Sequence, residues 1–226
     1  MRATEHKGLD GYLERASPFL MHDEARHNLQ FGIFSVLRDH PEVYPEFRLW
    51  LVEDGDEVVC VALRTPPYNL VLSQPSSDRA IEALVDHLAA TGEALPGVTA
   101  AEPEAHVFAR AWAGRNAVES AVHMREGVYR ITRPKPVPGH AGIPGVATER
   151  DRGLLKIWLD DFMREALPDE PPGPARERTL DTRLAGRKDA GLWLLEEGGG
   201  VVSLAGYGGL TPNGIRGGSR LHAFCT

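Results

Sequence analysis

Apolar residues recur along the first half of this chain in two spacings, one helical and one alternating. Leu29, Ile33, Val36 and Leu37 fall on one side of a helix, which predicts an amphipathic helix over residues 22–40. Alternating apolar residues on either side of Asp54-Gly55 predict two strands joined by a tight turn. The same reasoning predicts further elements: a helix over 9–20, strands over 47–53, 57–64 and 68–73, a helix capped by Ser76-Ser77-Asp78 and ending near Gly92, a strand over 98–101, a helix from Pro103 to Gly114, and a hairpin formed by 117–124 and 127–132.

One segment of this pattern occurs twice, with an offset of 143 residues. Residues 48–63 have the sequence RLWLVEDGDEVVCVAL and residues 191–206 have GLWLLEEGGGVVSLAG, with 8 identities in 16 aligned positions. Any two hairpins of apolar strands share alternation around a glycine-containing turn, which is the alternative explanation. The Leu-Trp-Leu run and the turn lie in the same register, which favours a true repeat and therefore two related domains in tandem.

The second half of the chain predicts elements in the same order as the start of the first. Pro and Gly crowd residues 134–146, which predicts a linker. The elements expected after it are a helix capped by residues 147–151 and running through Phe162, a Pro-rich loop over 168–174, a helix over 178–184, the repeated hairpin, and a turn over 211–214. We therefore expect an α+β fold, a mixed and mostly antiparallel sheet flanked by helices, with a complete domain over 1–133 and an incomplete second one over 147–226.

Composition excludes several classes of partner. The chain has 226 residues, 42% of them hydrophobic, and a net charge of −7 without a stripe of Lys or Arg, so nucleic acid and anionic membranes are unexpected partners. No apolar stretch is long enough for a membrane span, and the N-terminus lacks a signal-peptide pattern. Two cysteines, Cys60 and Cys225, do not make a disulfide framework, which favours a reducing, cytoplasmic location.

Residues with catalytic chemistry show no pattern that assigns a mechanism. The nine histidines do not stand at a metal-ligand spacing, so no metal site is expected. Gly198-Gly199-Gly200 lies inside a hairpin and is interpreted as a turn and not as a phosphate loop. Ser17, Ser35 and Ser203 lack the context of a nucleophile elbow. The catalytic residues are therefore unknown from the sequence.

The layout resembles the GNAT superfamily of acyl-CoA N-acyltransferases, in its tandem two-domain bacterial arrangement. The phrases that carry the resemblance are ATERDRGLLKIWLDDFMREAL, ARERTLDTRLAGRKDAGLWLLEEGGGVVSLAGYGG and TPNGIR. The resemblance implies transfer of an acetyl group from acetyl-CoA to the amine of a small molecule or protein. It also implies that Trp193, Ser203 and Tyr207 border the acceptor cleft, although burial in a core would equally account for Trp193.

The cofactor turn of this family is missing from the sequence. Such a turn resembles Gln/Arg-x-x-Gly-x-Gly/Ala at a helix start, where backbone N–H groups hold the pyrophosphate of acetyl-CoA. The equivalent residues 71–78 contain no glycine, and Pro75 removes a donor. In the second domain the equivalent segment would lie beyond Thr226. We therefore assign no cofactor-binding residue and expect this chain to be inactive as an acetyltransferase.

The residues after Arg216 suggest why the second domain is expected to be incomplete. One extra base in a G-rich run near Arg216 would convert a family-like strand, V-G-P-V-Y-T-P, into the observed GGSRLHAFC, so we expect a frameshift or truncation. A sheet that is incomplete there would leave an edge near 207–215 open to self-association. The alternative function is a non-catalytic module in which the intact first domain binds a small molecule or a protein.

Overall fold

The computed structural model describes residues 1–133, 135, 142–166, 174–185, 190–208 and 211–213. The chain divides into two compact units, Met1–Tyr129 and Arg130–Thr226. The fold is mixed α+β, with a five-stranded mixed sheet in the first unit and a three-stranded antiparallel sheet in the second.

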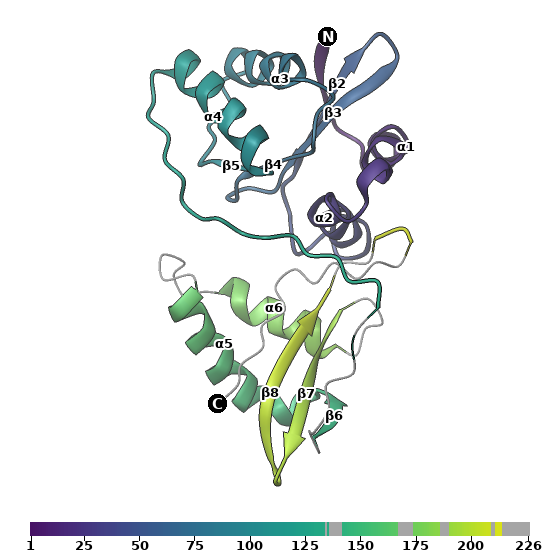
Figure 1. Ribbon diagram of the computed structural model, residues 1–226, viewed down its shortest axis with the longest axis vertical. Coiled ribbons are helices and arrows are strands. Elements are labelled where there is room, and N and C mark those ends of the chain that lie inside the picture. Colours follow the sequence, from purple (N-terminus) through teal and green to yellow (C-terminus); the bar gives the residue numbers. More distant parts are fainter. Residues whose placement is uncertain (134, 136–141, 167–173, 186–189, 209–210, 214–226) are drawn as a thin grey trace. The chain divides into compact units, whose positions relative to one another are not determined.

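The sheet of the first unit has its strands in chain order (Figure 1). Neighbouring strands are antiparallel from β1 to β4, and β4 pairs in parallel with β5. Parallel pairing requires a crossover, and helix α3, Asp78–Ala90, supplies it. The strands are β1 (Arg2–His6), β2 (Arg48–Asp54), β3 (Glu57–Arg64), β4 (Leu70–Leu72) and β5 (Val98–Thr99).

Helices cover both faces of this sheet (Figure 1). Its strands carry apolar side chains on both faces, so each face is buried under a layer of helices. On one face Trp50 and Ala62 pack with the buried stripe of α3 and with Phe108 of α4, Glu102–Asn116. On the other face Leu49 and Leu51 pack with α1, Leu9–Leu20, and α2, Asn28–Asp39. The two faces form two separate hydrophobic cores.

Most of the predicted elements of this unit are confirmed, with shifts at their ends. Helix α1 has the predicted bounds, and Pro103 lies at the first turn of α4 as expected. The helix predicted over 22–40 is shorter, because the 3-10 turn Met21–Asp23 precedes it and α2 begins only at Asn28. The edge strand β1 was not predicted.

The hairpin predicted over residues 117–132 is wrong. These residues form no strand and are exposed throughout. A segment of alternating apolar and polar residues becomes a strand only where a neighbouring strand can share its backbone hydrogen bonds. The sheet ends at β5, which pairs with β4 over just two residues. The side chains left exposed are Val118, Val122, Met124, Val128, Tyr129 and Ile131.

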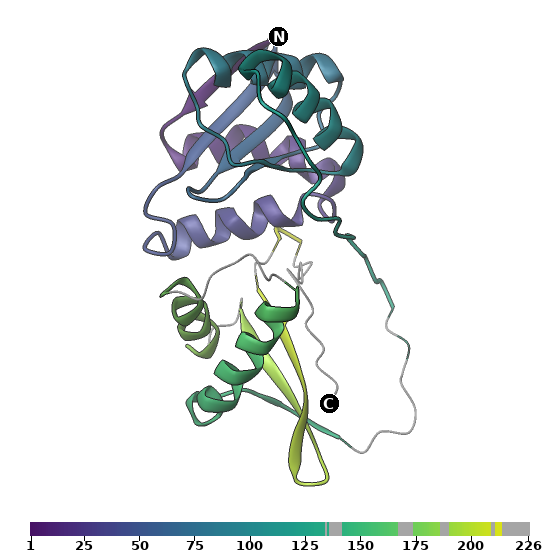
Figure 2. The same cartoon turned by 90° about the vertical axis from the view of Figure 1, so that its left-hand side faces the viewer.

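The second unit repeats the first five elements of the first, strand, helix, helix, strand and strand (Figure 2). Strand β6, Ile143–Val146, lies inside the segment predicted as a linker over 134–146, and that part of the prediction is wrong. Pro144 is tolerated because β6 is the edge strand. The other elements are the 3-10 turn Glu149–Asp151 and α5 (Arg152–Ala166), α6 (Pro174–Leu184), β7 (Gly191–Glu197) and β8 (Gly200–Tyr207).

The repeat extends to an irregularity of the hairpin. In the first unit the pairing of β2 with β3 shifts register between Val52 and Glu53. In the second, the pairing of β7 with β8 shifts between Leu195 and Glu196, the residues aligned with them by the 143-residue offset. Two unrelated hairpins would have no reason to share the position of a β-bulge. The likeness of the two segments is therefore structural as well as sequential.

Candidate functional site

The segment between β4 and α3, residues 73–77, is the one that the sequence resemblance compared with a cofactor turn, and three of its backbone donors are engaged within the protein. The N–H of Ser73 donates to the carbonyl of Val61 at 2.9 Å, and the N–H of Ser76 donates to that of Val59 at 2.9 Å. Pro75 has no N–H to offer. The loop is therefore bound to its own sheet through Ser73 and Ser76.

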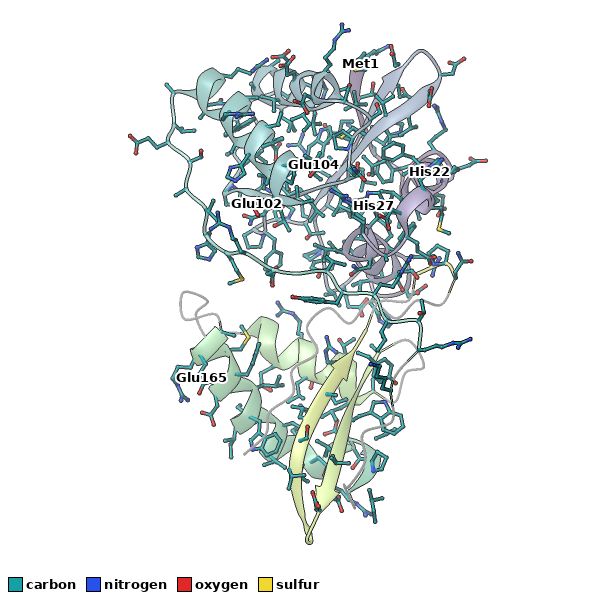
Figure 3. The ribbon with its side chains drawn as sticks, viewed as in Figure 1. Met1, His22, His27, Glu102, Glu104 and Glu165 are labelled. Carbon is teal, nitrogen blue, oxygen red and sulfur yellow. The ribbon has the colours of Figure 1, made fainter. Side chains whose placement is uncertain are left out.

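His27 engages a third donor of this loop. His27, labelled in Figure 3, precedes α2. The Gln74 N–H donates to Nε2 of His27 at 3.1 Å, and Nδ1 of the same ring lies 2.9 Å from the carbonyl of Leu20. This arrangement requires a neutral ring with its proton on Nδ1. Burial favours the neutral ring and lowers the pKa of His27, although the Leu20 carbonyl opposes the shift. The ring is 4% exposed and holds the start of α2 against the loop.

The start of α3 itself is also poorly suited to an anion. Ser77 occupies the N-cap position, but its side chain makes no capping hydrogen bond, so the predicted Ser/Asp cap is present only in its backbone form. The exposed carboxylate of Asp78 lies in the first turn, where it opposes a bound phosphate. These two features of the start of α3 do not favour a bound pyrophosphate.

The thiol nearest to this loop is unreactive. Cys60 is fully buried in β3, and its Sγ lies 3.9 Å from the Ser73 hydroxyl. Burial raises its pKa to about 12, despite the opposing effect of the Ser73 hydrogen bond. A thiol that stays protonated at neutral pH is not a nucleophile, so the side chain serves packing.

In the second unit the three candidate acceptor residues lie on one face of the sheet. Trp193 pairs with Ala205, Leu195 with Ser203, and Gly191 with Tyr207, and paired residues of antiparallel strands share a face. Helices α5 and α6 pack on the opposite face, against Leu192, Leu194 and Leu204. Trp193 is 41% exposed, while Ser203 and Tyr207 are half-buried.

Two local features fix the position of Tyr207. A Cβ atom on Gly191 would lie only 2.8 Å from the Tyr207 hydroxyl, so the ring lies across β7 because that residue is glycine. Arg183, at the end of α6, donates from Nη1 to the carbonyl of Tyr207 at 2.9 Å. Burial lowers the pKa of this guanidinium. The sequence analysis identified neither Arg183 nor His27, because a helical period marks apolar positions and not the polar residues between them.

Comparisons with known proteins add no family. No family model matches the chain, no curated protein does, and no solved structure does. Among the described helices, none has the length and apolar character that crossing a membrane requires. No group of three or more acidic, His or Cys side chains suited to a metal ion is found in the part of the chain that the structure describes. The proposed frameshift region after Arg216 lies outside the described residues.

Proposed function

We propose that this chain is a tandem protein of the GNAT superfamily in which the first unit has lost the acyl-CoA site. The observation that supports this most strongly is the strand order of the first unit, where four antiparallel strands are followed by a parallel β4–β5 pair with α3 as the crossover. The second unit repeats the first five elements with the same β-bulge. A duplicated unit of this layout agrees with the family phrases of the sequence.

The ancestral reaction on this proposal is acetyl transfer from acetyl-CoA to a primary amine, which releases the free thiol of CoA. The residues between β4 and α3 fit the cofactor poorly, since three of their N–H groups donate to Val59, Val61 and His27 and Pro75 has none. We assign no step of the reaction to the first unit. The face that carries Trp193, Ser203 and Tyr207 is proposed as the acceptor side of the second unit.

The first unit then acts as a non-catalytic module. One observation favours such a role, namely the exposed apolar side chains between Val118 and Tyr129. Exposed apolar side chains that gather in one segment are a feature of interaction sites. We propose a protein partner for this segment, and the chain's acidic balance and lack of a basic stripe argue against nucleic acid.

Restoring the turn tests the proposal. Residues 74–79 read Gln-Pro-Ser-Ser-Asp-Arg, so the triple variant P75A/S77G/R79G contains Gln-x-x-Gly-x-Gly. It adds one backbone donor, at position 75, and makes the donors at positions 77 and 79 less hindered. Calorimetry of the full chain should detect no acetyl-CoA binding tighter than about 1 mM. The triple variant should bind at least about tenfold more tightly, which corresponds to about 1.4 kcal/mol.

The single variant P75A is the matched control, because it adds one N–H without completing the turn. Circular dichroism of each variant checks that the helices persist. Micromolar binding by the unmodified chain would show that an acyl-CoA site exists and would refute the loss of function. A folded triple variant that binds no better than P75A would count against membership of the family.

A further inference from the structure

The ring of His27 makes two hydrogen bonds that only its neutral form can make together. Nδ1 lies 2.9 Å from the carbonyl of Leu20, at the end of α1, and Nε2 accepts the N–H of Gln74 at 3.1 Å. Protonation puts a hydrogen on Nε2 and turns this acceptor into a donor. Two donors would then face each other, so the contact with Gln74 cannot persist in the protonated ring.

Glu104, in the first turn of α4, has one carboxylate oxygen with a partner and one without. Oε1 accepts from Nη2 of Arg26 at 3.0 Å. Oε2 is buried and has no hydrogen-bond partner among the described residues. A buried acceptor without a donor costs free energy, so a donor that reached Oε2 would be favoured there.

The ion pair between Arg26 and Glu104 joins α4 to the residue directly before His27 in the chain (Figure 3). The negative charge of Glu104 acts on the His27 ring and favours its protonated form. Asp23 acts in the same direction, whereas Arg26 opposes protonation. The loop of residues 73–77 carries no titratable side chain of its own. The protonated ring therefore has a carboxylate to turn to and none on the loop.

We propose that His27 is an acid-sensitive switch, whose protonated Nε2–H leaves Gln74 and donates to Oε2 of Glu104. The Leu20 carbonyl can accept from Nδ1–H in both states, so that end of the ring stays in place. The Gln74 N–H then loses its acceptor, and the β4–α3 loop separates from the start of α2. Its hydrogen bonds from Ser73 and Ser76 to the sheet remain.

The exchange of partners compensates for a charge in a buried place. A hydrogen bond between an imidazolium and a carboxylate is stronger than one between a backbone N–H and a neutral ring. It offsets part of the cost of burying the charged ring. Because burial lowers the pKa of His27 from its ordinary value of 6.5, the loop is held above pH 6.5 and released at lower pH.

A nuclear magnetic resonance titration of the full chain tests the switch. The His27 ring signals and the Gln74 amide signal should change with one common midpoint below pH 6.5. At the acid end the Gln74 amide should exchange with solvent at least about tenfold faster than at neutral pH, after correction for the intrinsic effect of pH. The Ser73 and Ser76 amides should stay protected.

Three variants separate the role of Glu104 from a general effect of charge. Glu104→Gln should lower the His27 midpoint by at least about 0.5 pH units, because it removes the charge that favours the imidazolium. Glu102→Gln is the matched control, since it removes the same charge from the same helical turn at an exposed position and should shift the midpoint by less than about 0.2 pH units. Arg26→Gln should raise the midpoint, because Arg26 opposes protonation.

The ring proton itself reports the new hydrogen bond. At about pH 5 the Nε2–H signal of His27 should be visible in the unmodified protein, because a buried, hydrogen-bonded proton exchanges slowly. The same signal should be lost in Glu104→Gln. Amide spectra of each variant at pH about 7.5 check that the first unit remains folded.

Four results would overturn the proposal. The first is a His27 titration that leaves the Gln74 amide unchanged, and the second is an equal shift of the midpoint in Glu104→Gln and Glu102→Gln. The third is a lower midpoint in Arg26→Gln. The fourth is a first unit that unfolds before His27 titrates. None of these measurements involves acyl-CoA, so failure here is distinguishable from failure of the proposed function.

Discussion

The two sheets of this protein begin with the same hairpin and differ in what covers it. Trp50 is fully buried, whereas Trp193, at the equivalent position, is 41% exposed. The face that carries Leu49 and Leu51 in one sheet, and Leu192 and Leu194 in the other, is buried under two helices in both units. Only the tryptophan face differs, because α3 packs on it in the first unit and no described helix does so in the second.

The difference shows that a strand pattern specifies a hairpin without specifying its environment. Both hairpins have the same turn position and the same bulge, so local sequence accounts for their geometry. Burial of the tryptophan depends on a helix that follows later in the chain. Substitutions at equivalent residues of the two hairpins therefore report whether a helix packs on the tryptophan face of each sheet.

The largest effect is expected from removing the two tryptophans. Trp50→Ala should lower the free energy of unfolding of the first unit by about 3–5 kcal/mol, because it leaves a cavity among β2, β3 and α3. Arg48 would also lose the Trp50 ring, whose centroid lies 5.3 Å from its guanidinium carbon. Trp193→Ala should cost about 1 kcal/mol or less, since the side chain is already partly in solvent. Urea unfolding followed by far-ultraviolet circular dichroism measures both. Equal losses would mean that the tryptophan face of the second sheet is covered.

A second contrast uses thiol reactivity at another equivalent pair, Cys60 and Ser203. In a C225S background, native Cys60 should react with a thiol reagent at least about a hundredfold more slowly than it does in urea, because the raised pKa and full burial both protect it. Adding Ser203→Cys should introduce one thiol that reacts in the native state, since Ser203 is half-buried on the open face. Slow reaction of this introduced thiol would indicate that the face is covered in solution.

The smallest effect concerns pH and is confined to the first unit. The pKa of His27 is lowered from its ordinary value of 6.5 by burial, so the folded state binds fewer protons than the unfolded state. Stability is therefore complete above pH 6.5 and falls as the pH drops through this value towards the folded pKa. Protonation would also abolish the hydrogen bond that Nε2 accepts from Gln74.

Urea midpoints at about pH 7.5 and about pH 5.5 measure this dependence. His27→Gln should reduce the difference between the two midpoints. His22→Gln is the control, because exposed His22 also lies near a backbone carbonyl, that of Phe19 at 3.0 Å, but does not reach the loop. If both variants keep the full pH dependence of the urea midpoint, titrating groups other than His27 are responsible for it.

Predictions from the sequence succeeded where one element suffices to explain a pattern. Helix α1, helix α3 and the two hairpins follow from periodicity and turn residues. They failed where the structure of a segment depends on whether a neighbouring strand pairs with it. Residues 117–132 alternate as strands do but meet no ladder, and β6 forms in a Pro/Gly-rich segment because the edge of β7 receives it.

The candidate site was predictable only in part for the same reason. Trp193, Ser203 and Tyr207 lie at alternate positions, so the sequence alone sets them on one face of a hairpin. It does not place His27 against Gln74 or Arg183 beside Tyr207, since those contacts join residues 47 and 24 positions apart.

The sequence by itself determined the repeat, the hairpins with their bulge and the apolar stripes of the helices, because these depend on interactions between residues close along the chain. Only the tertiary structure decided which tryptophan is buried and which loop donors are engaged. Burial and hydrogen-bond satisfaction depend on what arrives from distant parts of the chain. For that reason two nearly identical segments have different surroundings within one protein.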